Sequence, residues 1–270
     1  MIIEVENAIR LASKNHILPY FGKLDSSDIR EKSPGDIVTI ADVETEAALA
    51  EKFVELIPNS QIVGEEADSS GARLSQRLTT SETLWIIDPL DGTQNFTSGS
   101  PRFATLVTLV VDGQPACSWT YTPILKTMAI AIVGRGAYVN GKRVQVNPPV
   151  PRLGFIDIAA PQMHWWPDSF RELAENLRTA GANLSHFDTA GLSYLDVVLG
   201  QRCVLLLTWE SVWDHAAGLL LLQEAGGTST TFDGSAFALE GGNALPLIAA
   251  PSHACAQLVY NALLGAPPAS

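Results

Sequence analysis

The spacing of apolar residues changes along the chain, and this change is what most limits the folds it can adopt. From about residue 3 to residue 21, and again over residues 42–58, apolar side chains recur at helical spacing. Short runs rich in β-branched and aromatic residues, bounded by Gly, Pro and Asp, then follow over residues 60–66, 84–88, 103–113, 115–123 and 126–134. Helices followed by a group of strands predict a mixed domain, and exclude an all-α or all-β fold.

A second mixed half follows a proline-rich break. The stretch at 147–152, NPPVPR, is the best candidate for a domain boundary. Beyond it we expect strands at 154–160 and 203–209 and helices around 169–180, 190–199 and 214–227. The prediction is an N-terminal half over residues 1–147 and a C-terminal half over residues 152–270.

Several local signals fix the expected turns and helix ends. Asn140-Gly141 predicts a tight hairpin turn. Asp42 is expected to cap the second helix, with Pro58 just beyond its end. Asp214 is expected to cap the last of the predicted helices, which Gly226-Gly227 would terminate.

The composition of the 270-residue chain excludes several classes of protein. Its formal net charge of −12 makes nucleic acid an unfavourable partner. No apolar stretch reaches the ~18 residues of a membrane span, and the first residues do not resemble a secretory signal. The three cysteines, Cys117, Cys203 and Cys255, lie far apart and suit a reducing compartment. We therefore expect a cytoplasmic protein that does not bind membranes.

The most informative segment is LWIIDPLDGTQNF, residues 84–96. Its apolar run leads directly into Asp88 and Asp91, so a buried strand should end in a turn that presents two carboxylates. Gly92 would let backbone approach a ligand, and the N–H groups of Gly92 and Thr93 could face an anion. The two carboxylates and the Leu90 carbonyl suit a hard divalent cation. An acidic turn can also serve only as a helix cap. Two further acids, Glu65 and Asp214, likewise follow apolar runs, and this favours a shared ligand site.

Together these segments resemble the inositol monophosphatase family. The resemblance rests on VGEE (63–66), WIIDPLDGTQNF (85–96) and WDHAAGLLLLQEAGG (213–227), in the family's order and spacing. The segments at 33–42 and 134–146 are similar as well, so the likeness spans nearly the whole chain. It implies an α+β fold of the sugar-phosphatase type, a layered αβαβα sandwich with two mixed halves. The same superfamily includes fructose-1,6-bisphosphatase.

The resemblance also implies roles for individual residues. Two or three Mg²⁺ ions, with Mn²⁺ as a possible substitute, would be held by Glu65, Asp88, the Leu90 carbonyl, Asp91 and Asp214. Gly92 and Thr93 would bind the phosphate. Asp42 and Thr93, with Glu65, would carry the catalytic step, in which metal-activated water attacks phosphorus. Family members are Li⁺-sensitive and often dimeric, so lithium inhibition and a homodimer are expected.

The wall that would contact the alcohol differs from the family pattern. An ungapped count back from Asp214 puts Leu207 where inositol phosphatases have a glutamate, unless Glu210 supplies it after a small shift. Asp188 falls at a usual glycine, whereas Thr189 and Ala190 agree with the family. The expected substrate is therefore a small polyol, sugar or inositol monophosphate. Histidinol phosphate, 3′-phosphoadenosine 5′-phosphate and a non-catalytic binding role remain as alternatives.

Overall fold

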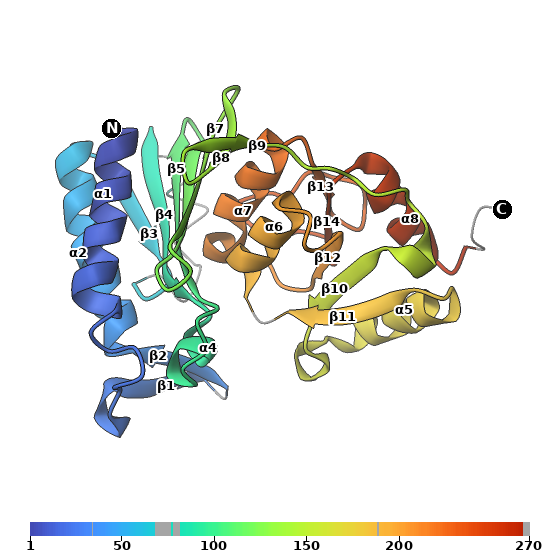
Figure 1. Cartoon of the computed structure of the whole chain (residues 1–270), viewed down its shortest axis with the longest axis horizontal. Helices are drawn as coiled ribbons and strands as arrows, with labels where there is room; N and C mark the ends of the chain where they lie inside the picture. Colours follow the sequence, from blue (N-terminus) through green and yellow to red (C-terminus); the bar gives the residue numbers. More distant parts are fainter. Residues whose placement is uncertain (34, 68–76, 78–81, 188, 267–270) are drawn as a thin grey trace.

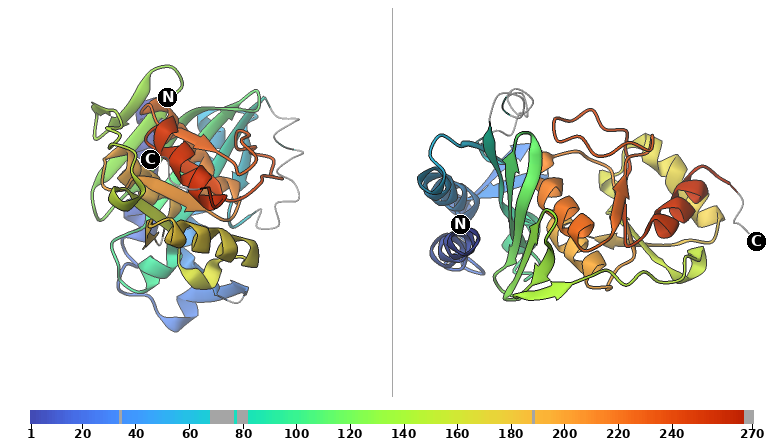
Figure 2. Two further views of the ribbon diagram at one scale, coloured as in Figure 1. Left: turned by 90° about the vertical axis from the view of Figure 1, so that its right-hand side faces the viewer. Right: turned by 90° about the horizontal axis from the view of Figure 1, so that it is seen from above.

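The structure is a computed structural model that describes residues 1–33, 35–67, 77, 82–187 and 189–266. It has five layers, visible side by side in Figure 1 and from above in Figure 2: two helices, a large sheet, two helices, a smaller sheet and two helices. This order matches the expected αβαβα sandwich. Among the described residues no helix is long and apolar enough to cross a bilayer.

The first outer layer contains α1 (Ile2–Ala12), extended by a π-helical turn over Ser13–Ile17, and α2 (Ile40–Leu56). The predicted first helix therefore changes its hydrogen bonding after residue 12. Between the helices, the polar residues 23–36 predict a loop, but the structure has a hairpin there, formed by β1 (Ile29–Ser33) and β2 (Asp36–Thr39). The residues of these two strands are mostly polar and lack the run of apolar residues that predicts a strand, so the sequence did not indicate the hairpin.

The large sheet has seven strands in the order of the chain. They are β3 (Gln61–Gly64), β4 (Thr83–Asp91), β5 (Ala104–Val111), β6 (Gln114–Thr122), β7 (Thr127–Ile132), β8 (Gly136–Val139) and β9 (Lys142–Val144). Only β3 and β4 are parallel; the remaining neighbours are antiparallel. Asn140 and Gly141 both have positive φ between β8 and β9, which confirms the predicted tight hairpin turn.

The smaller sheet has the order β11-β10-β12-β14-β13. Its strands are β10 (Asp157–Pro161), β11 (Asn183–Phe187), β12 (Val204–Leu207), β13 (Thr228–Thr230) and β14 (Leu247–Ala250). The central helices α6 (Ala190–Val198) and α7 (Val212–Glu224) pack between the sheets, and α5 (Asp168–Thr179) and α8 (His253–Leu263) cover the outer face.

Alternate side chains of β4 point to opposite faces of the large sheet and pack against different helices. In β4, Trp85 and Ile87 pack toward α1 and α2, whereas Leu84 and Ile86 pack toward α7. The period of two places Asp88 on the α7 side, within the molecule. Residues 147–152 carry no regular structure and link the two sheets. The division of the chain into two domains there stays a prediction, because α6 and α7 contact both sheets.

Candidate metal and phosphate site

Strand β4 delivers two carboxylates into the space between the sheet and the central helices. Its pairing with β5 is irregular between Asp88 and Asp91, where the register shifts before pairing resumes at Asp91 and Ala104. The N–H of Leu90 donates to Asp88 Oδ1 at 2.9 Å, which fixes one oxygen of that side chain. Asp88 Oδ2 is buried and has no hydrogen-bond partner among the described residues. A buried carboxylate oxygen without a donor is stable only if the group is protonated or if a positive charge lies beside it.

Asp214 reaches the same point from the C-terminal half. It is the third residue of α7, which begins at Val212 after Ser211 at the N-cap, so the expectation that Asp214 itself caps the helix is wrong. Asp88, Asp91 and Asp214 each place one oxygen so that the three lie within 4.8 Å of one another. Three carboxylate oxygens at this separation, with one of them unpartnered, fit a hard divalent cation.

Electrostatic repulsion makes this arrangement unfavourable without a cation. Burial raises the pKa of Asp88 well above its ordinary value, and the nearby carboxylates of Glu65, Asp91 and Asp214 raise it further. Burial likewise raises the pKa of Asp91 to about 7, partly offset by backbone donors, and raises that of Asp214 well above its ordinary value. Clustered acids with raised pKa values are typical of functional sites, because a structural core has no need of them.

The first turn of α6 holds Asp91 in place. The backbone N–H groups of Ala190 and Gly191 donate to Asp91 Oδ1 and Oδ2 at 3.2 and 2.8 Å. A Cβ on Gly191 would lie 2.4 Å from Leu106 and 3.0 Å from Asp91 Oδ2, so this close approach requires glycine. The helix N-terminus therefore supplies two donors to a buried carboxylate.

Gly92 turns the chain from β4 into the short helix α4 (Thr93–Thr97). Its φ of 93° lies in the left-handed region, and a Cβ there would meet Thr189 at 2.4 Å. The helix's first internal bond runs from the Phe96 N–H to the Gly92 carbonyl, so the N–H groups at its start have no partner within the helix. The structure thus places Gly92 and Thr93 on the pocket wall beside Asp91.

Asp42 and Thr93 form a connected pair on the other side of the turn. Thr39 is the N-cap of α2 and Asp42 is the third residue of the helix, so the prediction of Asp42 as the cap is wrong. The Asp42 side chain accepts from the Thr39 N–H at 2.8 Å in a capping box. Its other oxygen lies 3.0 Å from Thr93 Oγ1, which is also 3.1 Å from the Leu90 carbonyl oxygen. Burial raises the pKa of Asp42 to about 6.

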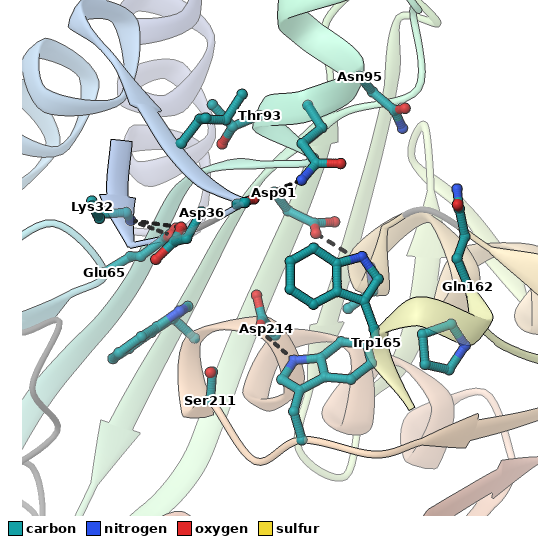
Figure 3. A pocket seen from close by; sticks show the side chains of 18 of the residues that line it. Lys32, Asp36, Glu65, Asp91, Thr93, Asn95, Gln162, Trp165, Ser211 and Asp214 are labelled. Atoms are coloured by element: carbon teal, nitrogen blue, oxygen red, sulfur yellow. Dashed lines mark hydrogen bonds and ion pairs between the residues drawn. The ribbon is translucent and has the colours of Figure 1, made fainter. Parts of the chain in front are cut away.

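Glu65 lines the same hollow and is paired with a lysine from β1. Lys32 Nζ lies 2.9 Å from a Glu65 carboxylate oxygen and 3.1 Å from one of Glu66, as the dashed lines in Figure 3 show for Glu65. Burial and the Glu65 carboxylate raise the pKa of Glu66 to about 7. Lys32 was not predicted, because it lies in the β1–β2 segment that was expected to be a loop.

A chain of hydrogen bonds supports Asp214 from behind. Trp209 Nε1 donates to Asp214 Oδ2 at 2.6 Å, and His215 Nε2 lies 2.9 Å from the Trp209 carbonyl oxygen. His215 Nδ1 is 3.2 Å from the Tyr194 hydroxyl. Burial lowers the pKa of His215 to about 4, so this histidine is neutral at physiological pH. It fixes Trp209, and through it one oxygen of Asp214.

The site opens onto a pocket of about 580 Å³ (Figure 3), a size that suits a small molecule. The acidic end of the pocket is lined by Glu65, Asp91, Gly92, Thr93 and Asp214. The hydrophobic part of its wall includes Trp165, Trp209 and Trp213. From the sequence, the loop that contains His164, Trp165 and Trp166 either borders the site or serves ordinary packing, and packing is the prediction. The structure shows one of each: Trp165 lines the pocket, and Trp166 is buried in the core.

The predicted substrate wall is only partly brought to the pocket. Ala190 lines it, and Thr189 is buried against Gly92. The prediction for Leu207 is corrected: strand alternation turns its fully buried side chain toward the α6–α7 core, and Thr208 and Trp209 line the pocket instead. Asp188 lies outside the described residues.

Glu210, the alternative to Leu207, is exposed. One of its carboxylate oxygens accepts from the backbone and side-chain N–H groups of Asn243 at 2.8 and 3.1 Å. The structure therefore assigns its hydrogen bonds to a neighbouring loop.

The layered fold is of the sugar-phosphatase type, and comparison with known proteins gives the family. The chain belongs to the inositol monophosphatase family, whose model matches residues 2–263. A fructose-1,6-bisphosphatase/inositol-1-monophosphatase of Aquifex aeolicus is 32% identical over 239 residues, 84% of each chain. A protein of Pseudomonas aeruginosa named Nus factor SuhB is also 32% identical, over 232 residues and 82% of each chain. The crystal structure of the suhB extragenic suppressor protein from Bartonella henselae superposes with a TM-score of 0.82 at 26% identity, covering 97% of this chain and 98% of that one.

Proposed function

We propose that this protein is a Mg²⁺-dependent phosphomonoesterase that hydrolyses a small phosphate ester to an alcohol and inorganic phosphate. The observation that carries the proposal is the cluster of Asp88, Asp91 and Asp214, which repel one another. Asp88 and Asp91 are buried and Asp214 is half-buried, and one Asp88 oxygen has no hydrogen-bond partner among the described residues. Relatives that are 31–32% identical over most of the chain are named as phosphatases of this kind.

The residues divide into those that hold the cation and those that act on the ester. Glu65, Asp88, Asp91, Asp214 and the Leu90 carbonyl are the ligands that we propose. Mg²⁺ bound there would lower the pKa of an attacking water and stabilise the entering and leaving oxygens of the phosphate. The remaining chemistry belongs to side chains and backbone groups of this chain.

We propose that Asp42 and Thr93 accept the proton of the attacking water. The Thr93 hydroxyl can donate to Asp42 Oδ1, so its lone pairs are free to accept from a water on the pocket side. With a pKa of about 6, Asp42 is mostly ionised at neutral pH and close enough to that pH to work as a base. The N–H groups of Gly92 and Thr93 at the start of α4 would orient the phosphate oxygens.

The alternative of a non-catalytic binding protein has support in the relatives named Nus factor SuhB. Such a role would leave the acidic residues without a purpose, and none of the five proposed ligand positions has lost its oxygen donor. The geometry therefore favours the enzyme.

Phosphate release from a panel of monoesters tests the proposal. We expect release with Mg²⁺, and with Mn²⁺ in its place, and none in EDTA; millimolar Li⁺ should inhibit. Undiminished release after exhaustive chelation would refute the metal dependence, and no release from any ester under any metal would refute the activity.

We also propose that the protein acts as a cytoplasmic homodimer on a small phosphorylated substrate, without membrane or nucleic acid. The net charge of −12 supports the last point, and the three buried free cysteines support a reducing compartment. Light scattering on the purified protein tests the dimer: a monomeric mass at micromolar concentration would exclude it.

A further inference from the structure

Four aromatic side chains are among the residues that line the pocket. They come from separate segments: Trp165 from the turn after β10, Phe187 from the end of β11, Trp209 from the loop after β12 and Trp213 from the first turn of α7. We call them the aromatic wall. Figure 3 shows Trp165 and Asp214 among the side chains that surround the same hollow.

The wall is fixed where it meets the acids and open farther out. Trp209 donates its indole N–H to Asp214 at 2.6 Å, and its ring lies 6.1 Å from that of Phe187. Trp165 is 48% exposed, and its ring edge lies 3.2 Å from where a Cβ on Gly35 would stand. A tryptophan left half exposed at a pocket leaves apolar surface for a ligand to cover.

The charged side chains of the pocket lining are mostly acidic. Among the described lining residues Lys32 is the only cation, and it is paired with Glu65 and Glu66. A ligand that carried a second phosphate would find no other cation in this lining. Hydroxyl partners remain beside the wall, since Thr208 and Ser211 also line the pocket.

We propose that the alcohol half of the substrate carries a flat, uncharged ring that stacks on the aromatic wall, with few hydroxyls, as in a nucleoside monophosphate. The inference rests on the proposed phosphatase function and names its substrate class. Stacking on an aromatic side chain requires a flat π-face on the ligand but no particular hydrogen bonds, so it selects for an aromatic ring and accepts different rings. A polyol has no π-face to stack, and its hydroxyls would have to find partners among the polar lining residues such as Thr208 and Ser211.

The test compares two esters of equal size. Benzyl phosphate and cyclohexylmethyl phosphate are both esters of primary alcohols, but only the first has an aromatic ring. We expect the Mg²⁺-loaded enzyme to favour benzyl phosphate by about tenfold in kcat/KM, from the usual strength of stacking. Adenosine 2′-monophosphate should be preferred over inositol 1-phosphate and over adenosine 2′,5′-bisphosphate.

Substitutions show whether the wall is the cause. Trp165→Leu should reduce the benzyl-to-cyclohexylmethyl ratio toward one, and Trp165→Phe should restore most of it. Trp209 is unsuitable, because it also holds Asp214. Phe155→Leu is the matched control: Phe155 is 77% exposed and does not line the pocket, so the ratio should not change. Calorimetry with benzylphosphonate, which is not hydrolysed, should give a weaker Kd for Trp165→Leu than for wild type, Trp165→Phe and Phe155→Leu.

The two proposals fail differently. If no ester is hydrolysed with Mg²⁺, the phosphatase function is refuted. If esters are hydrolysed but the two matched esters react equally, or Trp165→Leu leaves the ratio unchanged, the function stands and the aromatic substrate class is overturned.

Discussion

At the scale of single residues, Asp88 has the least favourable surroundings in the site. It is buried at the end of β4, surrounded by Glu65, Asp91 and Asp214, with one oxygen unpartnered. In a folded protein such a group either remains protonated or is neutralised by a cation.

Replacing Asp88 with asparagine should separate these effects. Asp88→Asn removes a charge but keeps the shape, so the melting temperature in EDTA should stay the same or rise, since repulsion among the remaining acids falls. The Mg²⁺-induced rise in melting temperature should disappear. Differential scanning calorimetry with and without Mg²⁺ measures both, with exposed Asp112→Asn as a control that should behave as wild type. A full Mg²⁺-induced rise in the variant would contradict the role of Asp88.

The raised pKa values also predict how stability depends on pH without metal. The pKa of Asp91 rises from its ordinary 3.8 to about 7, that of Glu66 from 4.5 to about 7, and that of Asp42 from 3.8 to about 6. The folded state therefore binds more protons than the unfolded state between these values, so stability is lost as pH rises from about 4 to about 7. In EDTA the melting temperature should fall across this window, and Mg²⁺ should reverse the fall. A rise with pH in EDTA would show that these acids are not buried together.

At the scale of elements, the first turn of α6 and the end of β4 must approach closely. Gly191→Ala would place a Cβ 2.4 Å from Leu106 and 3.0 Å from Asp91 Oδ2. We expect it to destabilise the fold by about 1–3 kcal/mol, as overpacking does, and to weaken Mg²⁺ binding. Urea unfolding and a calorimetric Mg²⁺ titration measure the two effects.

A matched control exists for this substitution. A Cβ on Gly154 would come no closer than 3.9 Å to its nearest neighbour, the Gly181 carbonyl oxygen, so Gly154→Ala should leave both measurements nearly unchanged. Equal effects of the two alanines would mean that α6 does not position Asp91.

Elements also show what could be read from the sequence. Strand β4 was predictable because an apolar run ends in carboxylates, and the β8–β9 turn because Asn-Gly adopts positive φ. The β1–β2 hairpin was not, since its strands are mostly polar and their pairing involves few apolar contacts. The helix starts at Thr39 and Ser211 were displaced by three residues because an acid in the first turn resembles a cap.

The substrate wall shows the limit of counting along a sequence. Leu207 was placed by an ungapped count, but one residue along a strand reverses the face on which a side chain lies. The count therefore placed Leu207 in a segment that lines the pocket through Thr208 and Trp209, whereas Leu207 itself lies in the core. Trp165 and Lys32 come from segments distant from the motifs, and only the fold brings them to the pocket.

At the scale of the whole molecule, the acidic cluster joins the two halves. Asp88 and Asp91 come from the large sheet, whereas Asp214 comes from α7, which packs between both sheets. Mg²⁺ should therefore protect β4 and α7 together from hydrogen exchange, because a bound cation stabilises only the state in which they meet. Exchange measured with Mg²⁺ and with EDTA checks this. Protection confined to one of the two elements would contradict a shared site.

If carboxylates from both halves form one metal-dependent phosphatase site, turnover depends on the carboxylate that the second half supplies. Phosphate release by Asp214→Asn, compared with wild type at the same Mg²⁺ concentration, tests it most directly. Asp214 lies in the second half and contributes one of three clustered oxygens, so we expect release to fall by several orders of magnitude while the variant remains folded in EDTA. Turnover within tenfold of wild type at saturating Mg²⁺ would contradict this dependence.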